Sequence, residues 1–180
     1  MIAVTLGAPA LIAAALTLSA TPTSGFRAEL LKWLEESEKK VVALAEAVPA
    51  EKYGWRPADR VRSIGEVYLH VAGGNFVALG FLGLPIPEGM DPLKLDRTPA
   101  DRARTLGLVK QSFAELRAYV SRMSDDELDR PVTLFGRPST VREALFVVSL
   151  HQNQHLGQSI AYARMLGVRP PWTDESGTEP

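Results

Sequence analysis

The sequence predicts an all-α protein, a four-helix bundle with one long connection between its second and third helices. In four separate segments the apolar residues recur at three- and four-residue steps, which is the spacing of one helical face. Each segment also has a helix start signal, and strand-like alternation is too scarce to build a sheet. At 180 residues, with 46% hydrophobic side chains, the chain has the size of a single domain with its own core.

The first helix is expected over residues 25–48. Its apolar stripe comprises Phe26, Leu30, Trp33, Leu34, Val41, Leu44 and Val48. Ser24 precedes the helix as a candidate N-cap, and Pro49 ends it, because helices usually end before a proline. Residues 49–62 (PAEKYGWRPADRVR) then predict an irregular turn and a loop.

A second helix is expected over residues 63–82, because Ser63 and Glu66 have the spacing of a capping box. In such a box the serine side chain accepts a hydrogen bond from an N-terminal amide, and the glutamate accepts one from the serine amide. The glycine- and proline-rich residues 83–97 form the long connection. Connections of this length are often functional or cross the end of a bundle.

Two more helices complete the predicted bundle. The third is expected to begin with Thr98 as N-cap and Pro99 at the first helical position. Residues 124–127 carry another capping signature, for one short turn before Pro131, and residues 132–137 predict a brief extended segment. The fourth helix is expected over residues 140–166.

Residues 1–24 differ from the rest of the chain. No charged side chain occurs in residues 1–20, and a short apolar run is followed by small residues, as in a secretory signal peptide. The alternatives are a disordered or loosely helical N-terminal tail, or a wrongly assigned start site that omits the basic residues of a signal peptide. The bundle domain is then expected over residues 25–172, with a polar, disordered tail over residues 173–180. A cleaved signal would make the protein exported or periplasmic, and the alternative location is cytoplasmic.

Composition excludes several functions and narrows the chemistry of any site. The net charge is −1, and the basic residues are scattered among acidic ones, so no basic stripe is present for nucleic acid. The mature chain has no stretch suited to a stable membrane span. Because the chain has no cysteine, disulfides, thiolate nucleophiles and cysteine zinc sites are excluded. A metal would have to be held by histidine, carboxylate or water.

The three histidines are each predicted to lie in the middle of a helix, on an apolar stripe. His151 and His155 are four residues apart, so their rings project from the same face, one turn apart. With His70 from the second helix they are suited to hold one divalent metal ion through three nitrogens. The alternative is that the rings are only packed or hydrogen-bonded in a metal-free bundle.

Gly73 and Gly74 follow His70 in the interior of the second helix. A glycine there destabilises a helix by about 0.5–1 kcal/mol relative to alanine. Two such residues together predict that another backbone or a ligand approaches the helix closely at this point.

Four further residues are candidates for a role around the metal. Glu66 is a candidate ligand or base, although its place in the capping box already explains it. Gln154 and Gln158 either orient a histidine ring or a metal-bound water, or are ordinary helix residues. Tyr162 either supplies a hydroxyl to the pocket or only packs.

Two segments resemble the DinB/YfiT-like metalloenzyme family: residues 63–75 (SIGEVYLHVAGGN) and residues 151–167 (HQNQHLGQSIAYARMLG). Residues 48–57 (VPAEKYGWRP) are similar to the stretch between the first two helices in that family. The resemblance implies a DinB/YfiT-like four-helix bundle, and family members are often dimeric. It implies metal ligands at His70, His151 and His155. Activities known in the wider superfamily include thiol-dependent transferases and isomerases that use bacillithiol, mycothiol or glutathione.

We therefore expect a metal-dependent hydrolase or transferase that acts on a small-molecule substrate. Three imidazoles leave coordination positions for water or substrate, which is typical of a catalytic site. Zinc is the expected ion, with nickel or iron as alternatives. The alternative function is a non-catalytic protein of the cell envelope that binds a metal or a small ligand. Export would favour hydrolysis over thiol transfer, and a homodimer is expected from the resemblance alone.

Overall fold

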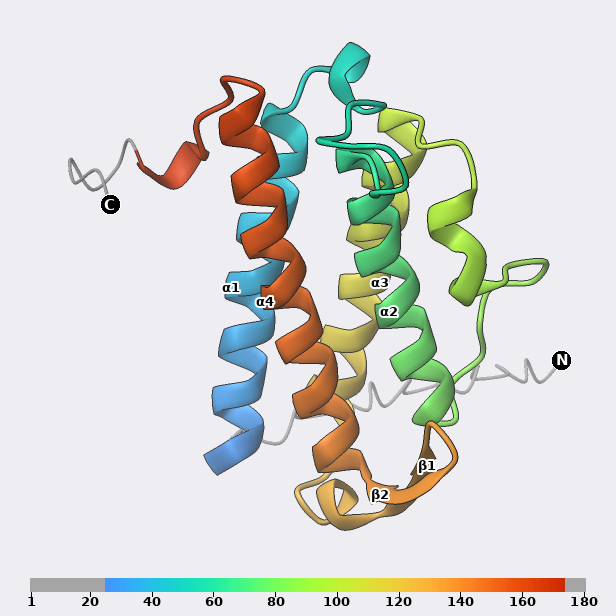
Figure 1. Cartoon of the computed structure of the whole chain (residues 1–180). Helices are drawn as coiled ribbons and strands as arrows, with labels where there is room; N and C mark the ends of the chain where they lie inside the picture. Colours follow the sequence, from blue (N-terminus) through green and yellow to red (C-terminus); the bar gives the residue numbers. More distant parts are fainter. Residues whose placement is uncertain (1–24, 174–180) are drawn as a thin grey trace, which may run out of the picture.

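The computed structural model describes residues 25–173, and four long helices form a bundle (Figure 1). The long helices are α1 (Gly25–Ala47), α2 (Ile64–Phe81), α3 (Arg102–Arg122) and α4 (Val141–Met165). Short 3-10 helices are η1 (Ala50–Lys52), η2 (Pro92–Arg97), η3 (Asp126–Asp129) and η4 (Pro171–Thr173). The predicted all-α bundle is confirmed. The predicted signal peptide, the candidate cap Ser24 and nearly all of the predicted C-terminal tail lie outside the described residues.

The chain passes up, down, down and up through the bundle, so α1 runs parallel to α4 and α2 runs parallel to α3 (Figure 1). Contacts between helix ends agree with this course. Arg27 at the start of α1 pairs with Asp125 just beyond the end of α3, at 2.9 Å. Arg130 donates a hydrogen bond to the carbonyl oxygen of Leu82 at the end of α2, at 2.9 Å. Because α2 and α4 pack against each other in opposite directions, the middles of the two histidine-bearing helices meet.

The helix start signals are only partly as predicted. The Oγ of Ser63 accepts a hydrogen bond from the Glu66 amide, and the Glu66 carboxylate accepts one from the Ser63 amide, so the capping box is confirmed. The start predicted for α3 is wrong. Asp101 is its N-cap, with the carboxylate accepting from the amide of the third helical residue at 2.9 Å. Thr98 ends η2 instead, and Pro99 precedes the helix, because the chain offers two residues suited to capping and the later one is used.

The long connection returns along the bundle because α2 and α3 run in the same direction. Its second half forms η2, which packs against α2. A Cβ atom at Gly73 would lie only 2.4 Å from the carbonyl oxygen of Pro92, so glycine is needed for this approach. The predicted close approach of another backbone is thus confirmed. Its consequence is that Asp96 and Arg97 of η2 lie beside the middle of α2.

A β-hairpin precedes α4, where the sequence predicts only one brief extended segment and no sheet. Strand β1 (Pro131–Leu134) pairs antiparallel with β2 (Arg137–Thr140). The two turn residues, Phe135 and Gly136, both have positive φ, 50° and 78°, as a two-residue turn of type I′ requires. Phenylalanine before glycine is not the usual signal for such a turn, so the sequence pattern does not indicate the hairpin. The turn places Phe135 against Phe81 at the end of α2, with ring centroids 4.9 Å apart.

The core lies between the four helices and is largely apolar. One residue predicted for the inner stripe of α1 is not in it, because Trp33 is 60% exposed. Its neighbour Leu34 faces the core instead, and adjacent helical residues do not share one face. None of the described helices is both long and apolar enough to span a membrane.

A buried polar network crosses this core and joins α2, α3 and α4. Asn75 Nδ2 donates a hydrogen bond to Ser112 Oγ at 3.0 Å, and Gln152 Nε2 donates one to Asn75 Oδ1 at 2.8 Å. All three residues are fully buried. Because Gln152 is next to His151, the network holds α4 at the height where the histidines face α2.

Candidate functional site

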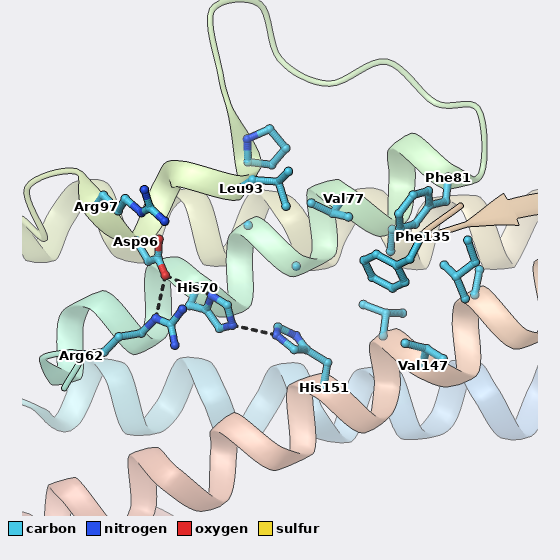
Figure 2. A pocket seen from close by; sticks show the side chains of 17 residues that line it. Arg62, His70, Val77, Phe81, Leu93, Asp96, Arg97, Phe135, Val147 and His151 are labelled. Atoms are coloured by element: carbon cyan, nitrogen blue, oxygen red, sulfur yellow. Dashed lines mark hydrogen bonds and ion pairs between the residues drawn. The ribbon is translucent and has the colours of Figure 1, made fainter. Parts of the chain in front are cut away.

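The three histidines come together between α2 and α4. One ring nitrogen from each lies within 4.8 Å of the other two. The Nε2 atoms of His70 and His151 are 3.2 Å apart, as drawn in Figure 2. Two nitrogens bound to one tetrahedral zinc ion at about 2.0–2.1 Å would be about 3.3 Å apart. The separation therefore suits two ligands of one ion.

Asp96 of η2 sets the orientation of His70. Its Oδ2 lies 3.2 Å from His70 Nδ1 and 2.6 Å from Arg62 Nε. Donation from Nδ1 to this carboxylate turns the Nε2 lone pair of His70 toward the other two rings. Nothing in the local sequence around Asp96 predicts this role. The only signal was the length of the connection that carries it.

Gln158 orients His155 in a similar way. His155 Nδ1 lies 2.8 Å from Gln158 Oε1, and Gln158 Nε2 donates a hydrogen bond to the hydroxyl of Tyr162 at 3.0 Å. With the amide oxygen facing His155, Nδ1 is the donor of this pair, and Nε2 is left free to bind a metal. The ring of Tyr162 rests edge-on against Trp55, with centroids 5.7 Å apart. For Gln158 the structure therefore shows contact with a histidine ring, and the hydroxyl of Tyr162 accepts the bond from Gln158.

His151 is positioned by the absence of a side chain opposite it. A Cβ atom at Gly74 would lie 2.4 Å from His151 Cε1 and 2.7 Å from its Nδ1. The Nδ1 of His151 is buried and has no hydrogen-bond partner among residues 25–173. Gly74 therefore leaves space for the imidazole ring of His151, as Gly73 leaves space for the carbonyl group of Pro92.

The surroundings keep two of these rings neutral at physiological pH. Burial lowers the pKa of His151 to about 4, and the two neighbouring histidines and Arg62 act in the same direction. Burial also lowers the pKa of His70, helped by Arg62 and opposed by Asp96. Because a metal binds only the neutral form of imidazole, both shifts keep lone pairs available.

The remaining two candidates are placed differently. Both oxygens of Glu66 are engaged, one by the Ser63 amide at 2.7 Å and one by Arg56 at 2.8 Å. The capping explanation of Glu66 is therefore confirmed. Gln154 is exposed on α4 and lines neither of the two hollows that adjoin the histidines.

The two hollows differ in character. An apolar groove of about 250 Å³ extends from His70 and His151 toward Phe81 and Phe135 (Figure 2). A second, more open hollow of about 550 Å³ is lined mainly by charged side chains. These are Arg56, Arg60, Arg62, Arg97, Glu66 and Asp96, with Val61 and Gln158 beside them. Three residues line both hollows, namely Arg62, Asp96 and Arg97, so the charged end of the groove borders the polar hollow.

These features define a class of protein: a four-helix bundle in which three histidines from two helices converge beside an open groove. The family model described as the DinB superfamily matches residues 34–159, a span that includes all three histidines. The chain therefore belongs to the DinB superfamily.

Solved structures share this fold. A DinB-like protein from Bacillus cereus ATCC 10987 is 21% identical with a TM-score of 0.68, covering 79% of this chain and 93% of its own. The DinB-like protein YjoA from Bacillus subtilis is 23% identical with a TM-score of 0.61, and the match covers 77% of this chain and 92% of YjoA. YfiT from Bacillus subtilis, described as a probable metal-dependent hydrolase with an unusual four-helix bundle topology, is 16% identical with a TM-score of 0.65, covering 82% and 94%. No curated protein matches this chain at a significant level.

Proposed function

We propose that this DinB-superfamily protein binds one divalent metal ion through His70, His151 and His155 and hydrolyses a small-molecule substrate there. The observation that carries the proposal is the 3.2 Å separation of two Nε2 atoms, with the third ring within reach of both. Zinc is the first candidate, and nickel and iron are alternatives, because imidazole suits all three. The description of YfiT as a probable metal-dependent hydrolase supports the same class of reaction.

The residues around the histidines fit a metal. Asp96 and Gln158 each accept a hydrogen bond from an Nδ1 atom, an arrangement that commonly fixes metal-binding histidines. His70 and His151 line the apolar groove, so room remains beside them for water and substrate, as in a catalytic site. A purely structural metal site would be closed on all sides.

A bound divalent metal polarises a carbonyl or phosphoryl oxygen and lowers the pKa of water toward neutrality. The chain supplies the rest of the site. The apolar groove shields one side of the histidine cluster from bulk water, and Arg62 and Arg97 offer positive charge to a developing oxyanion. Glu66 contributes little as a base because its two oxygens are already engaged by Ser63 and Arg56.

The test begins with the metal content of the untagged, full-length protein, measured by mass spectrometry after purification. His151→Ala removes one proposed ligand, and Gln154→Ala, at an exposed position on the same helix, is the matched control. We expect about one metal ion per chain in the parent and in Gln154→Ala, and little or none in His151→Ala. Parent protein that neither retains nor takes up zinc, nickel or iron would contradict the proposal.

The second stage screens the metal-loaded protein against carboxylic esters, amides and phosphoesters. We expect turnover of at least one class, lost at least a hundredfold in His151→Ala and retained in Gln154→Ala. Turnover that requires an added thiol would identify a transferase instead. Stoichiometric metal without turnover of any class would favour the non-catalytic binding protein.

A further inference from the structure

We propose that the ligand of this site is an amphipathic organic anion. Its charged head would lie at Arg62 and Arg97 beside the histidines, and its apolar tail would fill the groove toward Phe81 and Phe135. The inference deepens the function proposed above, on which it rests, by naming the chemical class of the substrate or product.

The groove changes character along its length (Figure 2). Its charged lining residues, Arg62, Asp96 and Arg97, all gather at the histidine end. The remainder of the lining beyond the two glycines is apolar and comes from α2, η2, the hairpin and α4. It includes Val77, Phe81, Leu93, Phe135, Val147 and Val148. A uniformly polar ligand would leave this half of the groove without suitable contacts.

The charges at the head end favour an anion. Four arginines and two carboxylates line the polar hollow, and both carboxylates are already engaged within the chain. Asp96 contacts His70 and Arg62, while Glu66 contacts Arg56. The excess positive charge includes the exposed Arg97, which belongs to both hollows. A carboxylate or similar anion complements this surface, and an ammonium group does not.

Phe135 is the observation that points to a tail. It is a non-glycine residue with a φ of 50°, a conformation in which asparagine and glycine are common and aromatic residues are rare. Phe135 is 64% exposed, and Leu93, which also lines the groove, is 72% exposed. Backbone strain of this kind concentrates at ligand-binding sites, and exposed apolar side chains around a groove gain most when a ligand covers them.

The volume of the groove limits the length of the tail. At about 250 Å³ it exceeds a protein cavity of roughly 150 Å³ that holds one benzene ring, so it has room for a six-membered ring and a few further carbons. An unbranched chain of about six to eight carbons, or a phenyl ring on a short linker, fits this space. Octanoate is therefore a suitable probe, with butanoate as the short-tailed comparison and octylammonium as the comparison with reversed charge.

The experiment is calorimetric titration of these three probes into the metal-loaded full-length protein, with the metal content measured in the same samples. Each buried methylene is worth about fourfold in affinity at best. We expect octanoate to bind at least tenfold more tightly than butanoate and at least tenfold more tightly than octylammonium.

Two variants locate the two parts of the ligand. Phe135→Asn keeps a residue suited to positive φ, so the hairpin is expected to persist while octanoate affinity falls at least fivefold and butanoate affinity does not change. Arg97→Gln is expected to weaken the binding of both octanoate and butanoate. Phe146→Asn replaces an exposed aromatic residue of α4 outside the groove and is expected to change neither affinity.

The outcomes separate this inference from the proposed function. Metal-containing protein that binds butanoate and octanoate equally, or whose octanoate affinity is unaffected by Phe135→Asn, would overturn the amphipathic ligand and leave the metal site standing. The protein could instead lack metal, bind octanoate more tightly than butanoate, and lose octanoate affinity in Phe135→Asn. That result would support the ligand class and overturn the metal-dependent function. Protein with neither metal nor tail preference would overturn both.

Discussion

His151 reaches His70 because the residue opposite it on α2 has no side chain. Two adjacent glycines follow His70, and each leaves space for a different neighbour: Gly73 for the carbonyl of Pro92 and Gly74 for the ring of His151. Interior glycines destabilise a helix, so their presence here is explained by these two approaches. The same reasoning makes each glycine a sensitive position for testing the site.

Replacing Gly74 with alanine is expected to weaken metal binding without destabilising the metal-free fold. The added methyl group would lie 2.4 Å from His151 Cε1, so the ring must move away from His70. We expect the metal affinity, measured by competition with a chromophoric chelator, to fall by roughly tenfold or more. The metal-free protein should keep its stability, because alanine favours the helix by about 1 kcal/mol.

Gly107→Ala is the matched control for this variant. Gly107 is exposed in the interior of α3, and no atom lies within 4 Å of a Cβ built there. It should gain up to about 1 kcal/mol in stability and keep the parent metal affinity. Equal metal affinities in the two variants would show that His151 does not depend on the space at Gly74.

The stability of the metal-free protein is expected to fall as the pH falls from about 6.5 toward 4. Burial lowers the pKa of His151 to about 4 in the folded chain, against 6.5 in the unfolded chain. Between these values the unfolded chain binds the extra proton, so acid favours unfolding. Urea unfolding of chelator-treated protein at pH 7 and pH 5 measures the effect. His151→Asn should show a smaller loss, and an equal loss in both proteins would contradict the assignment.

Among individual residues, the sequence predicts the three histidines but not all of the side chains that contact them. The i, i+4 spacing places His151 and His155 on one face, and helix geometry alone is enough for that. Gln158 and His155 are likewise neighbours on one helix, so their contact was among the alternatives. Asp96 reaches His70 from a separate segment, and its place depends on how the long connection packs against α2. Local periodicity contains no information on that packing.

Between elements, the register of α4 against α2 is held by the hydrogen bond from Gln152 to Asn75, and Asn75 is itself bonded to Ser112 of α3. A shift of α4 by one residue would break the bond between Gln152 and Asn75 and also turn His151 away from His70. The apolar contacts around them are less selective, because apolar side chains pack in several arrangements. The network therefore couples the fold of the core to the geometry of the site.

Removing the central member of this network is expected to destabilise the protein. Asn75→Leu leaves the buried Nε2 of Gln152 without its partner, while Ser112 Oγ keeps its bond to the Val109 carbonyl, at a cost of about 1–3 kcal/mol in the free energy of unfolding. The double variant Asn75→Leu/Gln152→Leu should recover part of this loss, because two of the polar groups are then absent. Urea unfolding of the four proteins of the cycle gives the coupling. A coupling energy below about 0.5 kcal/mol would contradict a shared network.

The start of a helix is predicted correctly where the sequence offers a single capping signal. The capping box at Ser63 marks the start of α2 without a competitor, and that prediction is confirmed. At α3 the chain offers Thr98 and Asp101, and the earlier residue instead ends η2. The hairpin depends on Phe135 taking a positive φ, which a phenylalanine rarely does and which a pattern of alternation does not reveal.

Across the whole molecule, the histidine cluster joins two helices that are far apart in the chain. His70 lies on α2, whereas His151 and His155 lie on α4, and these helices run in opposite directions through the bundle. A metal held by all three would therefore bridge the two helices at mid-height, close to the buried network. The unfolded chain brings these residues together only rarely, so the ion would bind the folded state in preference.

This preference leads to a prediction for metal removal. A ligand that binds only the folded state at a hundred times its Kd adds about 2.7 kcal/mol to stability, which raises Tm by roughly 5–10 °C for a domain of this size. Chelator treatment should therefore lower Tm by that amount in a thermal scan, and added zinc or nickel should restore it. His70→Ala removes the single ligand on α2 and with it the bridge, so its Tm should respond little to chelator or metal. Gln154→Ala should respond like the parent, since its side chain is exposed and outside both hollows. Two outcomes would contradict this prediction: a parent Tm that chelator and added metal leave unchanged, or a His70→Ala variant whose Tm responds as fully as that of the parent. Either would show that the three rings do not share an ion and are packed as ordinary side chains of the bundle.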